Sequence, residues 1–188
     1  MAYYICKQGE IPMMDTLPIY KIINYPLQNN GYKPFAQAKL CINDTKLIIE
    51  MLAFEMFPKQ ESELKAVISS EKSDAYIDVT ATATQKLCIA DSRGNSLEKS
   101  QIRYIKGEDL QGCYWGMIAE ISLDELQQAI SIEKINIGDS LMCNFYKLSD
   151  NVEKAHIGSM YPFEYSDKNS IYKKENLANF EIIKYGNI

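Results

Sequence analysis

At 188 residues, the chain is long enough to bury one sizeable core, and no Pro/Gly/Ser-rich linker or repeat divides it. Its formal net charge of -5, with 25 acidic residues against 20 basic ones, excludes the basic field that nucleic-acid binding requires. The opening MAYYICKQGEIPMMD lacks the pattern of a signal peptide, and no later segment is apolar over the length of a membrane span. We therefore expect a soluble, cytoplasmic protein that binds neither nucleic acid nor membranes.

The first strong pattern in chain order is a predicted β-hairpin that begins at Ala36. Two β-prone runs, AQAKLCIND and TKLIIEMLAFEM, are joined at the turn-forming pair Asn43-Asp44. Alternation in the second run puts Leu47, Ile49, Met51 and Ala53 on one side and Ile48, Glu50, Leu52 and Phe54 on the other. Because both sides are largely apolar, this run is predicted to be a central strand.

The remaining elements are also mostly short strands. LKAVIS is followed by the polar turn SSEKSD, and AYIDVTATATQKLCIAD reads as a long strand or a hairpin before a turn at residues 92–95. QIRYIKG, CYWGMIAEIS, GDSLMCNFYKLS and NFEIIKYG are further strands. A short helix over LQQAI is expected to begin with a capping box formed by Ser122 and Glu125.

Eight or nine strands with one short helix predict an all-β fold, an antiparallel β-sandwich or jelly roll. We expect one domain over residues 1–188. Residues 1–34, with four prolines, are predicted to be a lead-in that wraps the sheets, and residues 35–188 to form the sandwich.

Few residues suggest catalysis or metal binding. Phosphate-binding glycine loops are absent, and the single histidine, His156, excludes a multi-histidine metal site. A catalytic base paired with a thiol is one reading of His156, but a partly buried histidine bonded to a loop backbone is favoured. The five cysteines form no C-x-x-C pair, which indicates reduced, buried thiols rather than a disulfide framework or a zinc knuckle.

Carboxylates leave two further possibilities open. Glu55 with Glu61, or Asp74 with Asp78, could form a glycosidase-like pair, although alternating acids on a strand usually mark its solvated face. Oxygen ligands for calcium are available around Asn43-Asp44 and Asp150-Asn151. We expect no catalytic residue, no metal ligand and no cofactor, with calcium as the open alternative.

Five blocks follow one another along the chain: YPLQNNGYKPFAQAKLCINDTKLIIEMLAFEMFP, YWGMIAEISLDEL, GDSLMCNFYKLSD, HIGSMYPF and NLANFEIIKYG. They resemble blocks of the family 9 carbohydrate-binding modules. The first is similar to that family's opening hairpin, the second to its W-x-x-x-x-x-I-P-x-x-x-L segment, and the last three to its closing blocks. The blocks lie in the family's order between Tyr25 and Gly186.

The resemblance implies a β-sandwich of the kind that is appended to plant-polysaccharide hydrolases and clasps a sugar end between two tryptophans. In this sequence, Met160 replaces the tryptophan of the G-S-W block, with Tyr161 beside it, and Trp115 is predicted to lie in the core. The family's aromatic clasp is therefore incomplete.

Our first functional hypothesis is a non-catalytic domain that binds a saccharide weakly. Tyr161 would offer the stacking face, and Arg103, Glu55 and His156 would bond to sugar hydroxyls. An alternative is a structural or protein-interaction β-sandwich that has lost the sugar site. A third hypothesis, a glycoside hydrolase, requires two converging carboxylates in a cleft. The sequence gives no oligomeric state.

Overall fold

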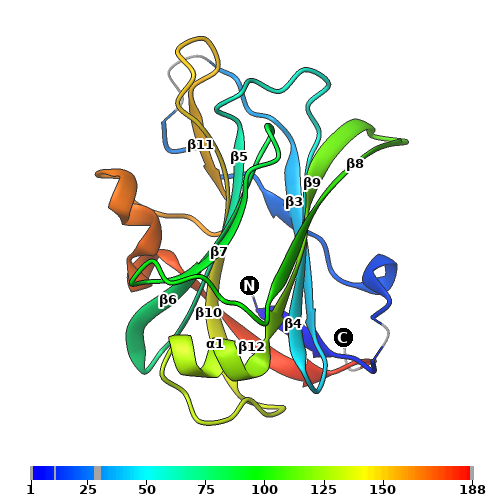
Figure 1. Cartoon of the computed structure of the whole chain (residues 1–188). Coiled ribbons are helices and arrows are strands. Elements are labelled where there is room, and N and C mark those ends of the chain that lie inside the picture. Colours follow the sequence, from blue (N-terminus) through cyan, green and yellow to red (C-terminus); the bar gives the residue numbers. More distant parts are fainter. Residues whose placement is uncertain (1, 11, 28–30, 187–188) are drawn as a thin grey trace.

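The protein is built almost entirely from β strands, as a computed structural model describes for residues 2–10, 12–27 and 31–186 (Figure 1). One α-helix, α1 (Leu123–Ala129), and three short 3-10 helices accompany the strands: η1 (Met14–Thr16), η2 (Lys168–Tyr172) and η3 (Lys174–Asn176). The strands in the described part of the chain are β1 (Tyr3–Lys7), β2 (Tyr20–Ile22), β3 (Ala36–Ile42), β4 (Lys46–Ala53), β5 (Glu63–Ser70), β6 (Ser73–Thr82), β7 (Leu87–Asp91), β8 (Gln101–Asp109), β9 (Gly112–Ser122), β10 (Ser140–Ser149), β11 (His156–Ser159) and β12 (Ala178–Lys184).

These strands form one continuous sheet that curls into a barrel-like shape. Its hydrogen-bonded order is β7-β6-β5-β10-β12-β1-β3-β4-β9-β8, with β11 paired to β10 and β2 paired to β3. The two end strands, β7 and β8, come close to each other and leave a seam between them (Figure 1). The all-β prediction is confirmed. A sandwich of two sheets, or a jelly roll, does not follow from this topology, because one ladder connects both sides.

The N-terminal segment belongs to the sheet itself. β1 runs parallel to both β12 and β3, and β2 is antiparallel to β3. An isolated bridge between Asn24 and Ser159 joins the chain after β2 to the end of β11. The segment predicted to be a wrapping lead-in thus also contributes β1 and β2 to the ladder, which its short apolar alternation did not indicate.

The predicted hairpin is confirmed as β3 and β4. Asn43 accepts hydrogen bonds from the backbone N–H groups of Thr45 (2.9 Å) and Lys46 (2.8 Å), which stabilises the turn. β4 lies between β3 and β9, and every residue of β3 is buried. The predicted division of faces also holds, because Leu47 and Ile49 lie in the main core while Ile48 packs in a small cluster on the opposite face.

The predicted capping box of α1 is wrong. Ser122 makes no side-chain cap, and its backbone N–H donates instead to the Ser100 hydroxyl at 3.0 Å. The carboxylate of Glu125 accepts hydrogen bonds from the Lys99 backbone N–H (2.9 Å) and from Ser100 (2.7 Å). A neighbouring loop thus supplies the partners that a local capping box would have used. Among the described residues, no helix is long and apolar enough to cross a membrane.

Candidate functional site

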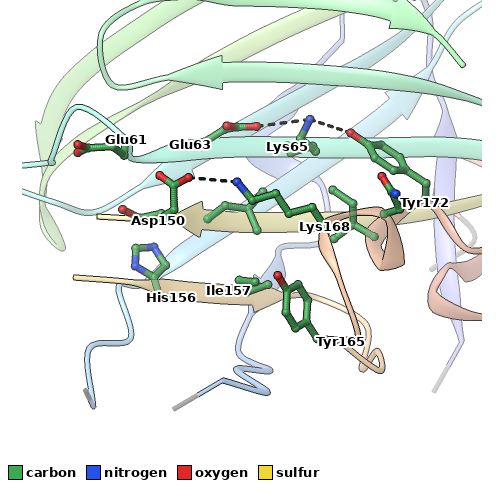
Figure 2. A pocket seen from close by; sticks show the side chains of 13 residues that line it. Glu61, Glu63, Lys65, Asp150, His156, Ile157, Tyr165, Lys168 and Tyr172 are labelled. Carbon is green, nitrogen blue, oxygen red and sulfur yellow. Dashed lines mark hydrogen bonds and ion pairs between the residues drawn. The ribbon is translucent and has the colours of Figure 1, made fainter. Parts of the chain in front are cut away.

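A pocket of about 340 Å³ lies on the outer face of the sheet, where β5, β10 and β11 run side by side (Figure 2). The segment that carries η2 forms its remaining wall, and Lys168 extends from that segment toward Asp150, with their charged atoms 3.2 Å apart. The pocket is thus assembled from segments that are far apart in the sequence. Its lining residues are Glu61, Glu63, Lys65, Leu148, Ser149, Asp150, His156, Ile157, Tyr165, Lys168, Asn169, Ile171 and Tyr172.

Part of the pocket surface is apolar because of strand register. Leu148 of β10 is paired with Glu63 of β5 on one side and with Ile157 of β11 on the other, so the three side chains share one face. Leu148 and Ile157 pack together with the buried Ile171 of η2 in a hydrophobic cluster on this outer face. Tyr165 belongs to the same cluster and lines the pocket beside Ile157 (Figure 2).

A charged cluster forms one end of the pocket. The Lys65 ammonium lies 2.7 Å from Asp78 and 3.4 Å from Glu63, and it donates a hydrogen bond to the Tyr172 hydroxyl at 3.2 Å. Tyr172 in turn donates to Asp78 at 2.6 Å, and its ring stacks on Tyr76 with the centroids 4.5 Å apart. Burial lowers the pKa of Lys65, but Asp78 outweighs it and holds that pKa above its ordinary value. Lys65 is therefore a fixed cation.

His156 lies at the inner edge of this pocket, almost fully buried. Burial and the nearby Lys147 ammonium lower the pKa of His156 to about 4, so the ring is neutral at pH 7. Its Nδ1 lies 2.6 Å from the Lys154 carbonyl oxygen and its Nε2 lies 3.1 Å from Lys147 Nζ. In the tautomer that satisfies both contacts, Nδ1–H donates to the carbonyl and Nε2 accepts from the ammonium. The favoured interpretation of His156, a partly buried histidine bonded to a loop backbone, is confirmed for the backbone contact, and the ring is buried more fully than expected.

Behind His156, inside the barrel, lies a buried ion pair between Glu55 and Lys147, with 3.1 Å between Oε2 and Nζ. Their side chains are 2% and 0% exposed, respectively. Glu55 also accepts hydrogen bonds from Ser62 (2.7 Å), Trp115 Nε1 (3.1 Å) and Tyr32 (2.9 Å). The carboxylate therefore has four donors, which is the condition under which a buried charge is tolerated.

The ionisation of this pair follows from its surroundings. Burial raises the pKa of Glu55, but the Lys147 ammonium and the hydrogen bonds from Ser62 and Tyr32 outweigh it, and the net pKa lies below the ordinary value. Burial lowers the pKa of Lys147 to about 8, with Glu55 opposing the shift. Both groups are charged at pH 7.

The four sequence-predicted site residues do not share one site. Glu55 and His156 are brought together, because both contact Lys147. Tyr161 lies elsewhere, with its backbone bonded to the Asn144 side chain and its ring edge-on to Tyr3.

Arg103 projects from β8 into a separate depression beside Glu120. Of the four, only His156 lines the pocket of Figure 2.

Sequence reasoning missed most of the pocket. Tyr165, Tyr172 and Lys168 lie in a stretch without strand periodicity, and only the fold places them against β5 and β10. Lys147 was missed because it lies within the predicted strand GDSLMCNFYKLS, where a lysine normally faces solvent. The residue in the sequence that could have pointed to a buried lysine was Glu55, an acid two residues after the strongly apolar strand β4.

The acidic pairs and loops that we considered are otherwise engaged. Asp78 is committed to Lys65 and Tyr172, and Asp74 pairs with Lys174 at 3.1 Å. In the two loops considered for calcium, Asp44 pairs with Lys7 and Asp150 with Lys168. Across the residues that the structure describes, no three His, Cys, Asp or Glu side chains are grouped so that they could hold a metal ion.

Comparison with solved structures identifies the architecture. A carbohydrate-binding module of family 9 from Caldicellulosiruptor kristjanssonii, in complex with cellotriose, superposes with a TM-score of 0.69 at 10% identity, covering 100% of this chain and 96% of the other. The chain has the fold of family 9 carbohydrate-binding modules.

Another such module from the same organism, in complex with glucose, gives a TM-score of 0.67 at 11% identity, covering 100% of this chain and 98% of that one. A candidate carbohydrate-binding protein from Bacteroides uniformis gives 0.71 at 13% identity, covering 96% and 98% of the two chains. No family model and no curated protein matches the sequence. The likeness to these structures is thus one of fold, at 10% to 13% sequence identity.

Proposed function

We propose that the protein is a non-catalytic domain that binds a saccharide in the pocket of Figure 2. The observation that carries the proposal is the chemistry of the pocket, which combines an apolar face at Leu148 and Ile157 with an exposed polar rim. Sugars present the same combination, since their C–H faces pack on apolar and aromatic groups while their hydroxyls bond to polar ones. The solved structures with this fold include modules bound to cellotriose and to glucose.

The proposed contacts divide by chemistry. Tyr165 and Ile157 would pack on the sugar face, whereas Glu61, Asp150 and Lys168 would accept from or donate to its hydroxyls. The last three are exposed, so they are still hydrated before a ligand arrives and each new bond replaces a bond to water. We propose weak binding for this reason.

The absence of catalysis is part of the proposal. Glycoside hydrolysis needs one carboxyl with a raised pKa opposite a second carboxylate. Lys147 keeps the pKa of Glu55 low, so this carboxylate stays ionised, and protein donors surround it. Asp78 forms an ion pair with Lys65 and accepts a hydrogen bond from Tyr172. The best-shielded carboxylates near the pocket are therefore in no position to act as a general acid.

Isothermal calorimetry with glucose and cellotriose tests the proposal. Saturable binding is expected to weaken about fivefold in Tyr165→Ala, because loss of an aromatic contact costs about 1 kcal/mol. Tyr165→Phe, which keeps the ring, should bind nearly as the parent does. Tyr185→Ala serves as the matched control, because Tyr185 is partly exposed but lies outside the pocket.

A second candidate function, a protein-interaction domain, is favoured by one observation. Large apolar side chains are exposed at three loop tips: Met56 and Phe57 (67% and 77%) after β4, Leu110 (107%) after β8, and Val152 (95%) after β10. Exposed apolar groups of this size can mark contact surfaces. If no sugar binds and Phe57→Ser removes association of the chain with itself in sedimentation, the interaction function replaces the saccharide function.

A further inference from the structure

Three sulfur atoms from separate segments meet on the face of the sheet opposite the main core. Cys6 of β1 and Cys41 of β3 are direct partners in the parallel ladder, so their side chains lie on the same face. Both are fully buried and belong to one small hydrophobic cluster. Met14 of η1 packs on this cluster, and its Sδ lies 3.8 Å from the Sγ of Cys41.

We propose that Cys6, Cys41 and Met14 form a binding site for a soft monovalent metal ion such as Cu(I). Thiolate and thioether sulfur are the ligands that select this class of ion over Mg²⁺ or Ca²⁺. A trigonal ion with bonds of about 2.3 Å holds two sulfur ligands about 4 Å apart. The spacing between Met14 and Cys41 already meets this requirement. The proposal does not depend on saccharide binding.

The segment that carries Met14 is held in place by its own contacts. The Met13 backbone N–H donates to the Gln8 side chain at 2.8 Å, and Tyr185 donates to the Thr16 hydroxyl at 2.8 Å. The thioether is therefore positioned over the thiols before any ion arrives, which reduces the ordering cost of binding.

An entry route leads to the same atoms. Met14 is partly exposed and lines a depression of about 470 Å³, whereas Cys6 and Cys41 are shielded from solvent beneath it. Ions would thus meet the thioether first and the thiols second. Ile48 and Ile118 line the same depression together with charged side chains, among them Glu10, Asp44 and Glu120. The sulfur donors themselves, rather than the approach, select a soft ion.

Binding must displace the thiol protons. Each thiol that ligates the ion as a thiolate releases one proton to solvent, so up to two protons are released per ion.

The experiment uses an anaerobic competition between the protein and the coloured Cu(I)–bicinchoninate complex. Cys88 and Cys113, which are not buried, are first replaced by serine so that they do not bind the ion. This background protein is expected to withdraw one equivalent of Cu(I). Cys41→Ala should abolish the withdrawal, and Met14→Leu should weaken it at least tenfold. Met13→Leu is the matched thioether control and should change nothing.

Two results would overturn the proposal: no withdrawal of Cu(I) by the background protein, or withdrawal by the Met14→Leu and Cys41→Ala variants that equals that of the background protein. Met14→Leu keeps the side-chain volume nearly constant and lies at a partly exposed position, so it is expected to fold even where Cys41→Ala does not. Far-UV circular dichroism checks this. X-ray absorption at the copper edge should show sulfur neighbours alone, and a shell with nitrogen or oxygen would contradict the assigned ligands.

Discussion

Replacing Lys147 with methionine should destabilise the protein through the partner that remains. Methionine has a similar length and no charge, so Glu55 keeps its hydrogen bonds from Ser62, Trp115 and Tyr32 but loses its only ion-pair partner among the described residues. Removing one member of a buried ion pair costs about 3–5 kcal/mol. Since three donors still serve the carboxylate, we expect a loss near the lower end, about 3 kcal/mol.

The pH dependence of this loss is a second signature. Without Lys147, only the hydrogen bonds oppose burial, which is the largest influence on the pKa of Glu55, so this pKa should rise above the ordinary value instead of lying below it. A carboxyl that is protonated carries no charge to bury. The stability deficit of Lys147→Met should therefore shrink as the pH falls from 7 through this raised pKa, whereas Glu55 of the parent, whose pKa lies below the ordinary value, stays ionised over the same range.

Urea unfolding, followed by tryptophan fluorescence and by circular dichroism, measures these effects at pH 7 and at pH 5. The double variant Glu55→Gln/Lys147→Met removes both charges and should recover most of the lost stability. A deficit below about 1 kcal/mol for Lys147→Met, or a double variant as unstable as the sum of the two single ones, would refute the reasoning.

Two other predictions concern single sites. His156 has a pKa of about 4 in the folded protein, against 6.5 in the unfolded chain. Its contribution to stability, up to about 3 kcal/mol, is therefore present above pH 6.5 and lost as the pH falls toward 4. In thermal melts, the melting temperature of His156→Gln should fall less steeply with acidification than that of the parent, and an equally steep fall would contradict the assignment. Gly116→Ala would place a methyl group against the Met51 carbonyl oxygen in the neighbouring strand, so urea unfolding should show a loss of several kcal/mol in the free energy of unfolding. Gly9→Ala is the control: its methyl group has open space, so the loss should be less than about 1 kcal/mol.

The sequence predicted the local elements better than their assembly. The β3–β4 hairpin followed from alternation and from the Asn43 turn, because both depend on neighbouring residues. The place of β1 could not be predicted, since a parallel ladder with β12 joins opposite ends of the chain. The capping box failed for a related reason: Ser100, distant in sequence, took the bond expected of Ser122 and Glu125.

In the candidate site, too, local contacts could be predicted from the sequence, whereas contacts between distant segments could not. The loop-backbone contact of His156 was predicted because a lone histidine is most often satisfied locally, and Lys154 supplies its backbone partner two residues away. Arg103 was predicted to bind sugar because of its guanidinium group alone, and its position on β8 places it in a different depression from the pocket of Figure 2. Tyr165 gave no signal, because its role depends on how the segment after β11 folds back over β10.

The most direct test of the saccharide proposal is a two-dimensional amide NMR titration of the parent protein with glucose and cellotriose up to millimolar concentration. The account predicts saturable shifts confined to the pocket of Figure 2, at Leu148, Ile157 and Tyr165 and at their neighbours in the strands. Shifts that cluster instead around Arg103, or no shifts at all, would contradict it.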